Sequence, residues 1–455
     1  MAKVVVSQKQ CTVNPLKMSQ AIGAALAFMG VDRAMPLLHG AQGCTSFGLV
    51  LFVRHFREAI PMQTTAMSEV ATVLGGFDNV EQALVNIAGR AKPALIGICT
   101  TGVSEVKGDD LNGFLKTIRA SHPELDSIAL IDTSTPDFEG SFQDGWATAV
   151  TRMIEELVEI PLQQTRLTRR INVLPGCHIT PGDIDELRDT FEAFSLEPIF
   201  LPDLSGSLDG HIPAEFTPTT LGGISVDQVQ KMGSARWSIA IGEQMRGAAI
   251  TLEHRTGVPY RLFDRLTGLA ANDELMGFLS KVSGVPVPQK YRRQRSQLVD
   301  AMLDGHFYLG GKRVAVAAEP DLLSTISHFL HEMGCEIQAA VTTTQSPVLE
   351  AIPATEVVLG DLGDLEERAG GADLLVTHSH GRQAAERLGV PLFRIGIPVF
   401  DRLGANHQVS VGYRGTRELI FNIGNLFLAN THEATPETWV RREEALHHAT
   451  ALQVQ

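Results

Sequence analysis

The chain repeats one hydrophobic pattern, and this repetition restricts the possible folds more than any other feature. A short run rich in Val, Ile and Leu is followed by a small or polar loop and then by a longer amphipathic segment. Short apolar runs of this kind are typical of strands buried on both faces, and helical segments between them connect parallel strands. The repetition therefore predicts an α/β protein with mostly parallel sheets flanked by helices.

Two breaks divide the pattern into three Rossmann-like units. A chain of 455 residues is too long for one compact core. The segment 159–170 interrupts the pattern, and a third unit opens at "KRVAVAAEPDLL", which predicts a strand and then a helix. We expect a first domain at 1–165, a second at 166–305, and a third at 306–455 that ends in helices and a tail. Within the second, Thr180 and Pro181 predict a helix start.

Composition and missing motifs exclude several classes of function. A net charge of −14 argues against a nucleic-acid partner, and no run reaches the roughly 18 apolar residues of a membrane helix. The amino terminus does not read as a signal peptide, and five scattered cysteines fit no disulfide framework, so we expect a cytoplasmic protein. Phosphate-binding, dinucleotide-binding and hydrolase motifs are missing.

Acidic side chains gather in three places, and loops follow three of the expected strands. We interpret the acidic clusters at 183–186, 361–367 and 442–444 as solvated surface. Ligands of parallel sheets bind beyond the carboxyl ends of the strands. The segments 99–102, 175–180 and 379–381 occupy such places, so we expect clefts there.

One cysteine lies in a glycine-rich loop. The stretch "HGAQGCTSF" surrounds Cys44 with Gly40 and Gly43, which allow backbone to approach a ligand closely. One thiolate is too few to hold a zinc ion or an iron–sulfur cluster, and the chain has no C-x-x-C. Taken alone, Cys44 is more simply a buried thiol. A cluster at this place would need thiolates from another chain.

Several longer blocks resemble the β-type chain of the nitrogenase component 1 family, in the same order and spacing. They are "NPLKMSQAIGAALAFMGVDRAMPLLHGAQGCTSF", "RHFRE", "TTGVSEVKGDDL", "TPDFEGS", "RIGIPVFDR" and "GYRG". The resemblance covers nearly the whole chain and implies the fold of that family. The blocks at 201–211 and 290–307 look more like the β chain of the scaffold that matures the iron–molybdenum cofactor than like the catalytic β chain.

The chain differs from a catalytic β chain at three positions, and these differences limit the kind of metal cluster that the resemblance implies. A catalytic β chain would carry cysteines where this chain has Ser19 and Gly102, and Asp137 replaces a serine that can also touch the larger cluster. Only Cys44 remains. The resemblance therefore implies a [4Fe-4S] cluster at the interface with an α-type chain, with Cys44 as this chain's ligand and three partner cysteines. The residues around it would be Gly40, Gln42, Gly43 and Thr45.

Other candidate ligands carry less weight. Cys99 lies three residues before Gly102 on a strand and points to the other face, so we reject it as a substitute. Cys11 stays open, because a loop near a terminus can fold back. Arg57 and Glu58 match the place where the catalytic β chain supplies groups to a metal ion between two β chains; Glu58 is a candidate oxygen ligand, and an ordinary surface pair is the simpler interpretation.

The resemblance implies a cofactor-assembly scaffold with no stand-alone activity. An α-type scaffold chain would join this one in an α2β2 heterotetramer, hold most of the cofactor precursor, and keep it while molybdenum and homocitrate are inserted. The nitrogenase iron protein, a precursor donor and the apo catalytic protein would be further partners. The alternatives are the β chain of a nitrogenase-like reductase acting on dinitrogen or a tetrapyrrole, and a structural chain with no cluster.

Overall fold

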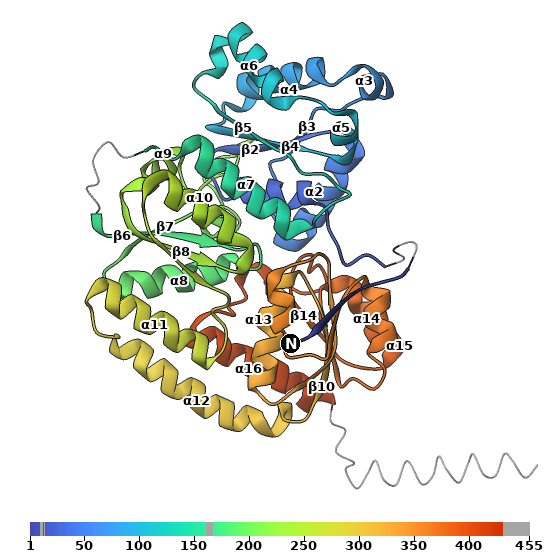
Figure 1. The fold of residues 1–455 in the computed structure, drawn as a ribbon, viewed down its shortest axis with the longest axis vertical. Coiled ribbons are helices and arrows are strands. Elements are labelled where there is room, and N and C mark those ends of the chain that lie inside the picture. The colour runs from blue at the N-terminus through green and yellow to red at the C-terminus, as the bar shows by residue number, and fades with distance from the viewer. Residues whose placement is uncertain (10–11, 13, 161–166, 431–455) are drawn as a thin grey trace, which may run out of the picture.

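Three parallel sheets, each covered by helices, make up the protein (Figure 1). The computed structural model describes residues 1–9, 12, 14–160 and 167–430. Every strand pairing in this part of the chain is parallel. The predicted α/β class is therefore confirmed. No helix of the described residues is long and apolar enough to cross a membrane.

The first sheet has the strand order β3-β2-β4-β5 and has amino-terminal helices on both faces (Figure 1). Its strands are β2 (Ala34–His39), β3 (Gln63–Thr64), β4 (Leu95–Thr100) and β5 (Ala129–Thr133). The helices of this unit are α1 (Gln20–Met29), α2 (Gln42–Phe56), α3 (Glu69–Leu74), α4 (Phe77–Ala91), α5 (Gly102–Lys107), α6 (Leu111–Ser121) and α7 (Phe142–Leu157). All residues of β2 and β4 are buried, as the continuous apolar runs predict.

The second sheet has the order β7-β6-β8-β9. Its strands are β6 (Leu167–Pro175), β7 (Glu197–Phe200), β8 (Ala235–Ile241) and β9 (Tyr260–Phe263), and its helices are α8 (Pro181–Ala193), α9 (Val226–Gln230), α10 (Arg246–Thr256), α11 (Leu269–Ser283) and α12 (Gln289–Leu309). Thr180 caps α8 by accepting the Asp183 N–H at 3.0 Å, with Pro181 as the first helical residue. The predicted helix start is confirmed.

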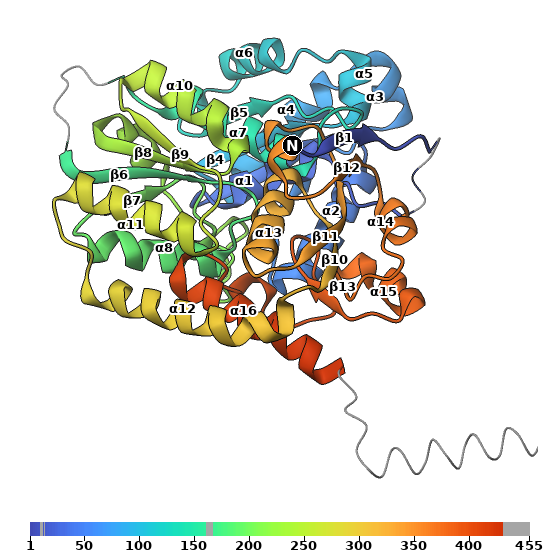
Figure 2. The ribbon, with the colours of Figure 1, turned by 60° about the horizontal axis from the view of Figure 1, so that its bottom comes forward.

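The third sheet has six strands in the order β1-β12-β11-β10-β13-β14. They are β1 (Lys3–Val6), β10 (Arg313–Ala317), β11 (Glu336–Thr342), β12 (Glu356–Leu359), β13 (Leu374–Thr377) and β14 (Leu392–Arg394). Its helices are α13 (Pro320–Glu332), α14 (Leu362–Arg368), α15 (Arg382–Leu388) and α16 (Gly412–Asn430). Figure 2 shows α16 running beside α12, which joins this unit to the second.

Two local features differ from the sequence-based expectation. Strand β1 pairs with β12 in the third sheet, so we propose that the domains follow the three sheets and that residues 3–6 belong with the third. The segment 159–170 is not wholly a connection, because β6 already begins at Leu167. The remaining boundaries stay a proposal.

The expectation that the acidic clusters are solvated surface is wrong for four carboxylates. Asp183 is fully buried, and it accepts the backbone N–H groups of Ser410 at 2.6 Å and Val411 at 3.1 Å. Asp361 and Asp364 are buried in a reciprocal cap at the start of α14. Glu186 is buried beside Arg414. These carboxylates satisfy backbone and guanidinium donors, which periodicity alone does not reveal. The cluster at 442–444 lies outside the described residues.

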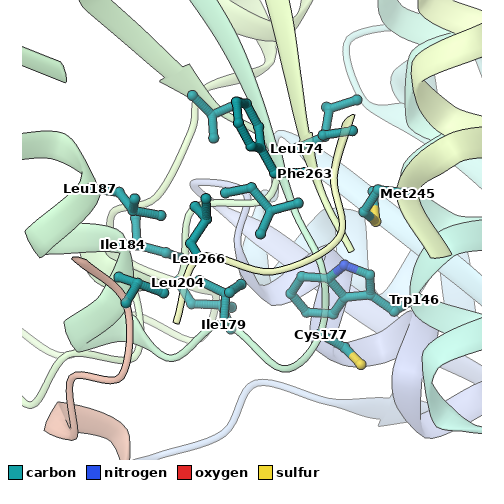
Figure 3. Close-up of a cluster of buried hydrophobic side chains, with 14 of the residues drawn as sticks. Trp146, Leu174, Cys177, Ile179, Ile184, Leu187, Leu204, Met245, Phe263 and Leu266 are labelled. Carbon is teal, nitrogen blue, oxygen red and sulfur yellow. The ribbon is translucent and has the colours of Figure 1, made fainter. Parts of the chain in front are cut away.

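Helices α1 and α7 touch through their backbones. A Cβ built on Gly23 of α1 would lie 1.8 Å from the Phe142 carbonyl oxygen, and one on Gly145 of α7 would lie 1.9 Å from the Gln20 carbonyl oxygen. All ten residues of α1 are buried. Trp146 of α7 reaches the second sheet, donating its indole N–H to the Pro175 oxygen at 3.0 Å, and lies in one buried cluster with Cys177 (Figure 3).

A polar junction joins the start of α7 to the start of α13. The Ser141 hydroxyl donates to Glu319 Oε2 at 2.6 Å, and the Asp321 N–H donates to Gln143 Oε1 at 3.3 Å. Asp321 also accepts the Gln244 side chain of the second unit at 3.0 Å. Burial raises the pKa of Glu319 to about 7 and that of Asp321 to about 6. The three units therefore meet around the carboxyl groups of Glu319 and Asp321, whose pKa values are raised by burial.

We expect Gly23→Ala to destabilise the protein by about 1–3 kcal/mol or more, because the added methyl group meets a backbone carbonyl. Gly89→Ala is the matched control, since its added methyl meets nothing within 4 Å on α4, and we expect it to be neutral or stabilising by up to about 1 kcal/mol. Thermal unfolding of both variants measures the difference. Equal stability of the two variants would contradict the close packing.

We expect Glu319→Gln to change how stability depends on pH. Because the folded-state pKa of Glu319 is raised to about 7, the folded protein binds the proton more tightly than the unfolded chain does. Stability contributed by this group is therefore lost as pH rises from about 4.5 to 7, by up to roughly 3 kcal/mol. The Gln variant should lose less stability over that window in denaturant titrations. The exposed control Glu215→Gln should retain the parental slope, and a parental slope in Glu319→Gln would contradict the assignment.

Candidate functional site

Cys44 lies in the first turn of α2, directly after the buried strand β2. The helix begins at Gln42 with Ala41 as its extended N-cap, and the Cys44 N–H donates to the Ala41 oxygen at 3.2 Å. Cys44 is partly buried against the core, whereas Gln42 and Gly43 are exposed and Thr45 is buried. Of the residues predicted to surround Cys44, Gln42 and Gly43 therefore face solvent, whereas Thr45 lies inside the protein.

The two glycines of the loop have different reasons to be glycine. A Cβ on Gly40 would lie 2.3 Å from Thr101 Oγ1, so the chain's own packing requires glycine there. A Cβ on Gly43 would meet nothing within 4 Å. The Thr45 hydroxyl is buried and has no hydrogen-bond partner among the described residues. The open side of the turn at Gly43 leaves room for a group that this chain does not itself supply.

The electrostatic surroundings keep the Cys44 thiol protonated in the chain by itself. Burial raises its pKa, and the nearby Asp137 carboxylate raises it further, against a smaller opposing effect of a backbone N–H. A metal ion would favour the thiolate, because metal ligation displaces the thiol proton. Among the described residues, this loop therefore fits one thiolate ligand of an iron–sulfur cluster.

Asp137 and Gly102 are in direct contact. The Gly102 N–H, at the start of α5, donates to Asp137 Oδ2 at 2.8 Å, and a Cβ on Gly102 would lie 3.2 Å from the same oxygen. A cysteine at 102 would therefore press against this carboxylate. The two positions that the resemblance marks as departures from the catalytic β chain are therefore in contact in this structure.

The other cysteines and Ser19 do not form a ligand group with Cys44. Ser19 is the N-cap of α1 and makes no side-chain capping bond. Cys99 is fully buried in β4, and burial raises its thiol pKa strongly. Cys11 lies outside the described residues, so the structure does not test whether it can approach the cluster site. Within the described residues, no three His, Cys, Asp or Glu side chains gather as a metal-binding group.

Glu58 lies just past the end of α2, on the wall of a groove of about 460 Å³. Its Oε1 accepts the Gly210 N–H at 2.7 Å, and burial raises its pKa, with Asp209 contributing in the same direction. The Arg57 guanidinium donates to the Phe400 oxygen at 3.2 Å instead of pairing with Glu58. A metal ion at Glu58 stays a prediction that needs ligands from another copy.

His39 supports the Cys44 loop and was missed by the sequence-based reasoning. It is fully buried, with Nε2 3.0 Å from Asp109 Oδ2 and Nδ1 3.0 Å from Thr65 Oγ1. Its backbone oxygen accepts the hydroxyls of Thr101 at 2.9 Å and Ser104 at 3.0 Å. Burial lowers the pKa of His39 although Asp109 opposes this. The sequence signal that could have identified His39 is its position at the end of a buried strand, directly before Gly40.

A cavity of about 70 Å³ lies where the three units meet. Residues of the predicted cleft at 175–180 line it, together with Glu319 and apolar side chains from the first and third units. Neither lysine nor arginine is among its lining residues. The cavity is therefore small, mainly apolar and without a cation.

Comparisons with known proteins agree with this arrangement. The family of nitrogenase component 1 type oxidoreductases matches residues 19–428. A solved structure titled "Nitrogenase Cp1 at pH 6.5" has 32% sequence identity and a TM-score of 0.90, covering 95% of this chain and 97% of that one. A second nitrogenase chain, 14% identical with a TM-score of 0.70, supports the fold alone.

Curated relatives extend over nearly the whole length. The "Nitrogenase iron-molybdenum cofactor biosynthesis protein NifN" of Bradyrhizobium diazoefficiens is 62% identical over 96% of this chain and 95% of its own length. Proteins of the same name from a Nostoc species and from Rhodobacter capsulatus are 50% and 46% identical, over 94% and 96% of this chain and 96% of each relative. The chain therefore belongs to the nitrogenase component 1 type oxidoreductase family, and within it to the NifN group.

Proposed function

We propose that this chain is the β-type subunit of a scaffold for iron–molybdenum cofactor biosynthesis, and that Cys44 supplies one ligand to a [4Fe-4S] cluster shared with a NifE-like α-type chain. The names of its near full-length relatives support the biosynthetic role. The observation that carries the cluster assignment is one partly exposed thiol in an open helix turn, beside the Asp137–Gly102 contact. A cluster bound there would pass electrons, and its potential would depend on the charges around it.

Exposed apolar side chains support a partner at this face. Phe47 and Val50 follow Cys44 on α2 at 66% and 52% exposure, and Val106 on α5 and Phe138 beside Asp137 are also exposed. Large apolar side chains that gather on a surface mark interaction sites. The α-type chain would cover them, place its cysteines opposite Cys44, and complete an α2β2 heterotetramer.

The precursor would be held mainly by that partner. The cavity at the meeting of the three units measures about 70 Å³ and has a carboxyl group but no lysine or arginine in its lining. Iron–sulfur precursors and homocitrate are anionic and much larger, so this cavity suits neither. Molybdenum and homocitrate insertion, with the nitrogenase iron protein as electron donor, would then proceed on the α-type side before transfer to the apo catalytic protein.

A catalytic reductase of the same family is the second candidate function. The 32% identity to a nitrogenase chain over nearly the whole length favours it. For dinitrogen reduction the larger cluster lacks its ligands at Ser19 and Gly102, whereas a tetrapyrrole reductase allows a four-iron interface cluster. The identity of the copurifying α-type chain separates the scaffold from both reductases.

We expect Cys44→Ala to remove the cluster. The measurement is iron content and electron paramagnetic resonance of the reduced, anaerobically isolated complex, with copurification of the α-type chain as the check on folding. Iron should fall by one [4Fe-4S] equivalent per αβ pair. Cys99→Ala is the matched control, since that thiol is fully buried, and should keep the parental signal. An unaltered signal and iron count in Cys44→Ala would refute the assignment, and Cys11 would become the candidate.

Asp137→Asn should make the cluster-free Cys44 thiol more acidic. The Asp137 charge raises the pKa of Cys44, so the variant should reach half-maximal alkylation by iodoacetamide at lower pH. Peptide mapping by mass spectrometry separates Cys44 from the other cysteines. Glu139→Gln changes an exposed carboxylate two residues away and should leave the profile unmoved. Identical profiles for parent and Asp137→Asn would show that the carboxylate does not act on the thiol.

A further inference from the structure

The cavity between the three units carries polar groups that the proposed function does not use. Its walls come from the end of α2, the start of α7, the segment before α8, the start of α13 and the segment after β14. Most of these walls are apolar, including Phe56, Phe142, Leu204 and Ile395. Mainly apolar pockets with a few convergent polar groups are the usual form of small-molecule sites.

His55 presents one hydrogen-bond donor at this cavity. It is 7% exposed, and its Nδ1 accepts the Val399 N–H at 3.0 Å. Burial lowers its pKa to about 4, so the ring is neutral and its proton is on Nε2. Nε2 has no hydrogen-bond partner among the described residues. A buried donor of this kind calls for an acceptor.

His178 presents a second donor by the same logic. Its Nδ1 lies 3.5 Å from the Gln244 side-chain nitrogen, and the Cys177 N–H donates to Gln244 Oε1 at 3.3 Å, which orients that amide. Burial lowers the pKa of His178 to about 4. The neutral ring then carries its proton on Nε2, the nitrogen that does not face Gln244.

Glu319 supplies the complementary group on the wall of the same cavity. One carboxyl oxygen accepts the Ser141 hydroxyl at 2.6 Å and lies 3.5 Å from the Gln143 nitrogen. No lysine or arginine in the lining compensates this carboxyl group. An anionic ligand would therefore meet a carboxyl group and no cation, and a cationic ligand would meet two imidazole N–H groups that repel it.

We propose that this cavity binds a small uncharged molecule that has a hydrogen-bond acceptor and a donor on a short apolar body, the chemistry of a primary carboxamide. The carbonyl oxygen accepts from His55 and His178, and the amide N–H donates to Glu319. One water-sized group needs roughly 10–15 Å³ of such space. A cavity of about 70 Å³ therefore holds a ligand of about five heavy atoms. This site is independent of the cluster at Cys44.

Equilibrium dialysis with radiolabelled propionamide tests the site on the full-length protein isolated with its copurifying chain. We expect saturable binding that propionate and propylammonium, the matched anion and cation, compete for at least tenfold more weakly. Glu319→Leu and His55→Phe each remove one polar partner and should weaken binding about tenfold or more.

Ala405→Leu provides a second variant that keeps all three polar groups and fills space instead, since Ala405 lines the cavity. It should abolish binding, whereas Ala120→Leu on the exposed face of α6 should bind as the parent does. Parental binding by Ala405→Leu, equal binding of propionate, or no saturable propionamide binding by the parent would each overturn the proposal. Cluster content is measured on the same samples, so loss of the Cys44 cluster is distinguished from loss of this site.

Discussion

The backbone contact between α1 and α7 is the constraint on which the rest of the molecule depends. Gly23 and Gly145 each face a carbonyl oxygen of the other helix at distances that exclude any side chain. Because the two helices lie so close, α1 is buried along its whole length and α7 can reach all three units. It follows β5, its Trp146 bonds to Pro175 of β6, and Ser141 at its start bonds to Glu319 before α13. The three units are positioned by this pair of helices.

The candidate cluster site also depends on close packing, here the packing of strand β2 and of the two residues His39 and Gly40 that lead into the Cys44 loop. Strand β2 is buried throughout, His39 is held by Asp109 and Thr65, and Gly40 is packed against Thr101. One turn later the surroundings change, because Gly43 borders open space and Cys44 is partly exposed. A rigid inner wall and an open outer side are what a ligand shared between two chains requires. Preorganised ligands lose little freedom on binding.

Individual residues show which structural features could be predicted from the sequence and which could not. The buried strand β10 and the capped helix α8 were predicted because the apolar run in "KRVAVAAEPDLL" and Thr180–Pro181 are local signals. Burial of Asp183 and Asp364 was not predicted, because their donors lie on other segments or in caps seen only in three dimensions. The pairing of β1 with β12 was missed for the same reason, since these strands are about 350 residues apart. The role of His39 depends on Asp109, 70 residues away.

The sequence by itself determined the α/β class and the start of helix α8, since these depend on periodicity and local capping, and its resemblance to a known family made Cys44 the leading candidate cluster ligand. Only the tertiary structure decided that Asp137 contacts Gly102, that Gly40 is required by packing while Gly43 is not, and that two imidazoles and a carboxyl group line one cavity. The physical reason is that such contacts join segments distant along the chain. Their distances are set by how the helices and sheets pack, and no local pattern encodes that packing.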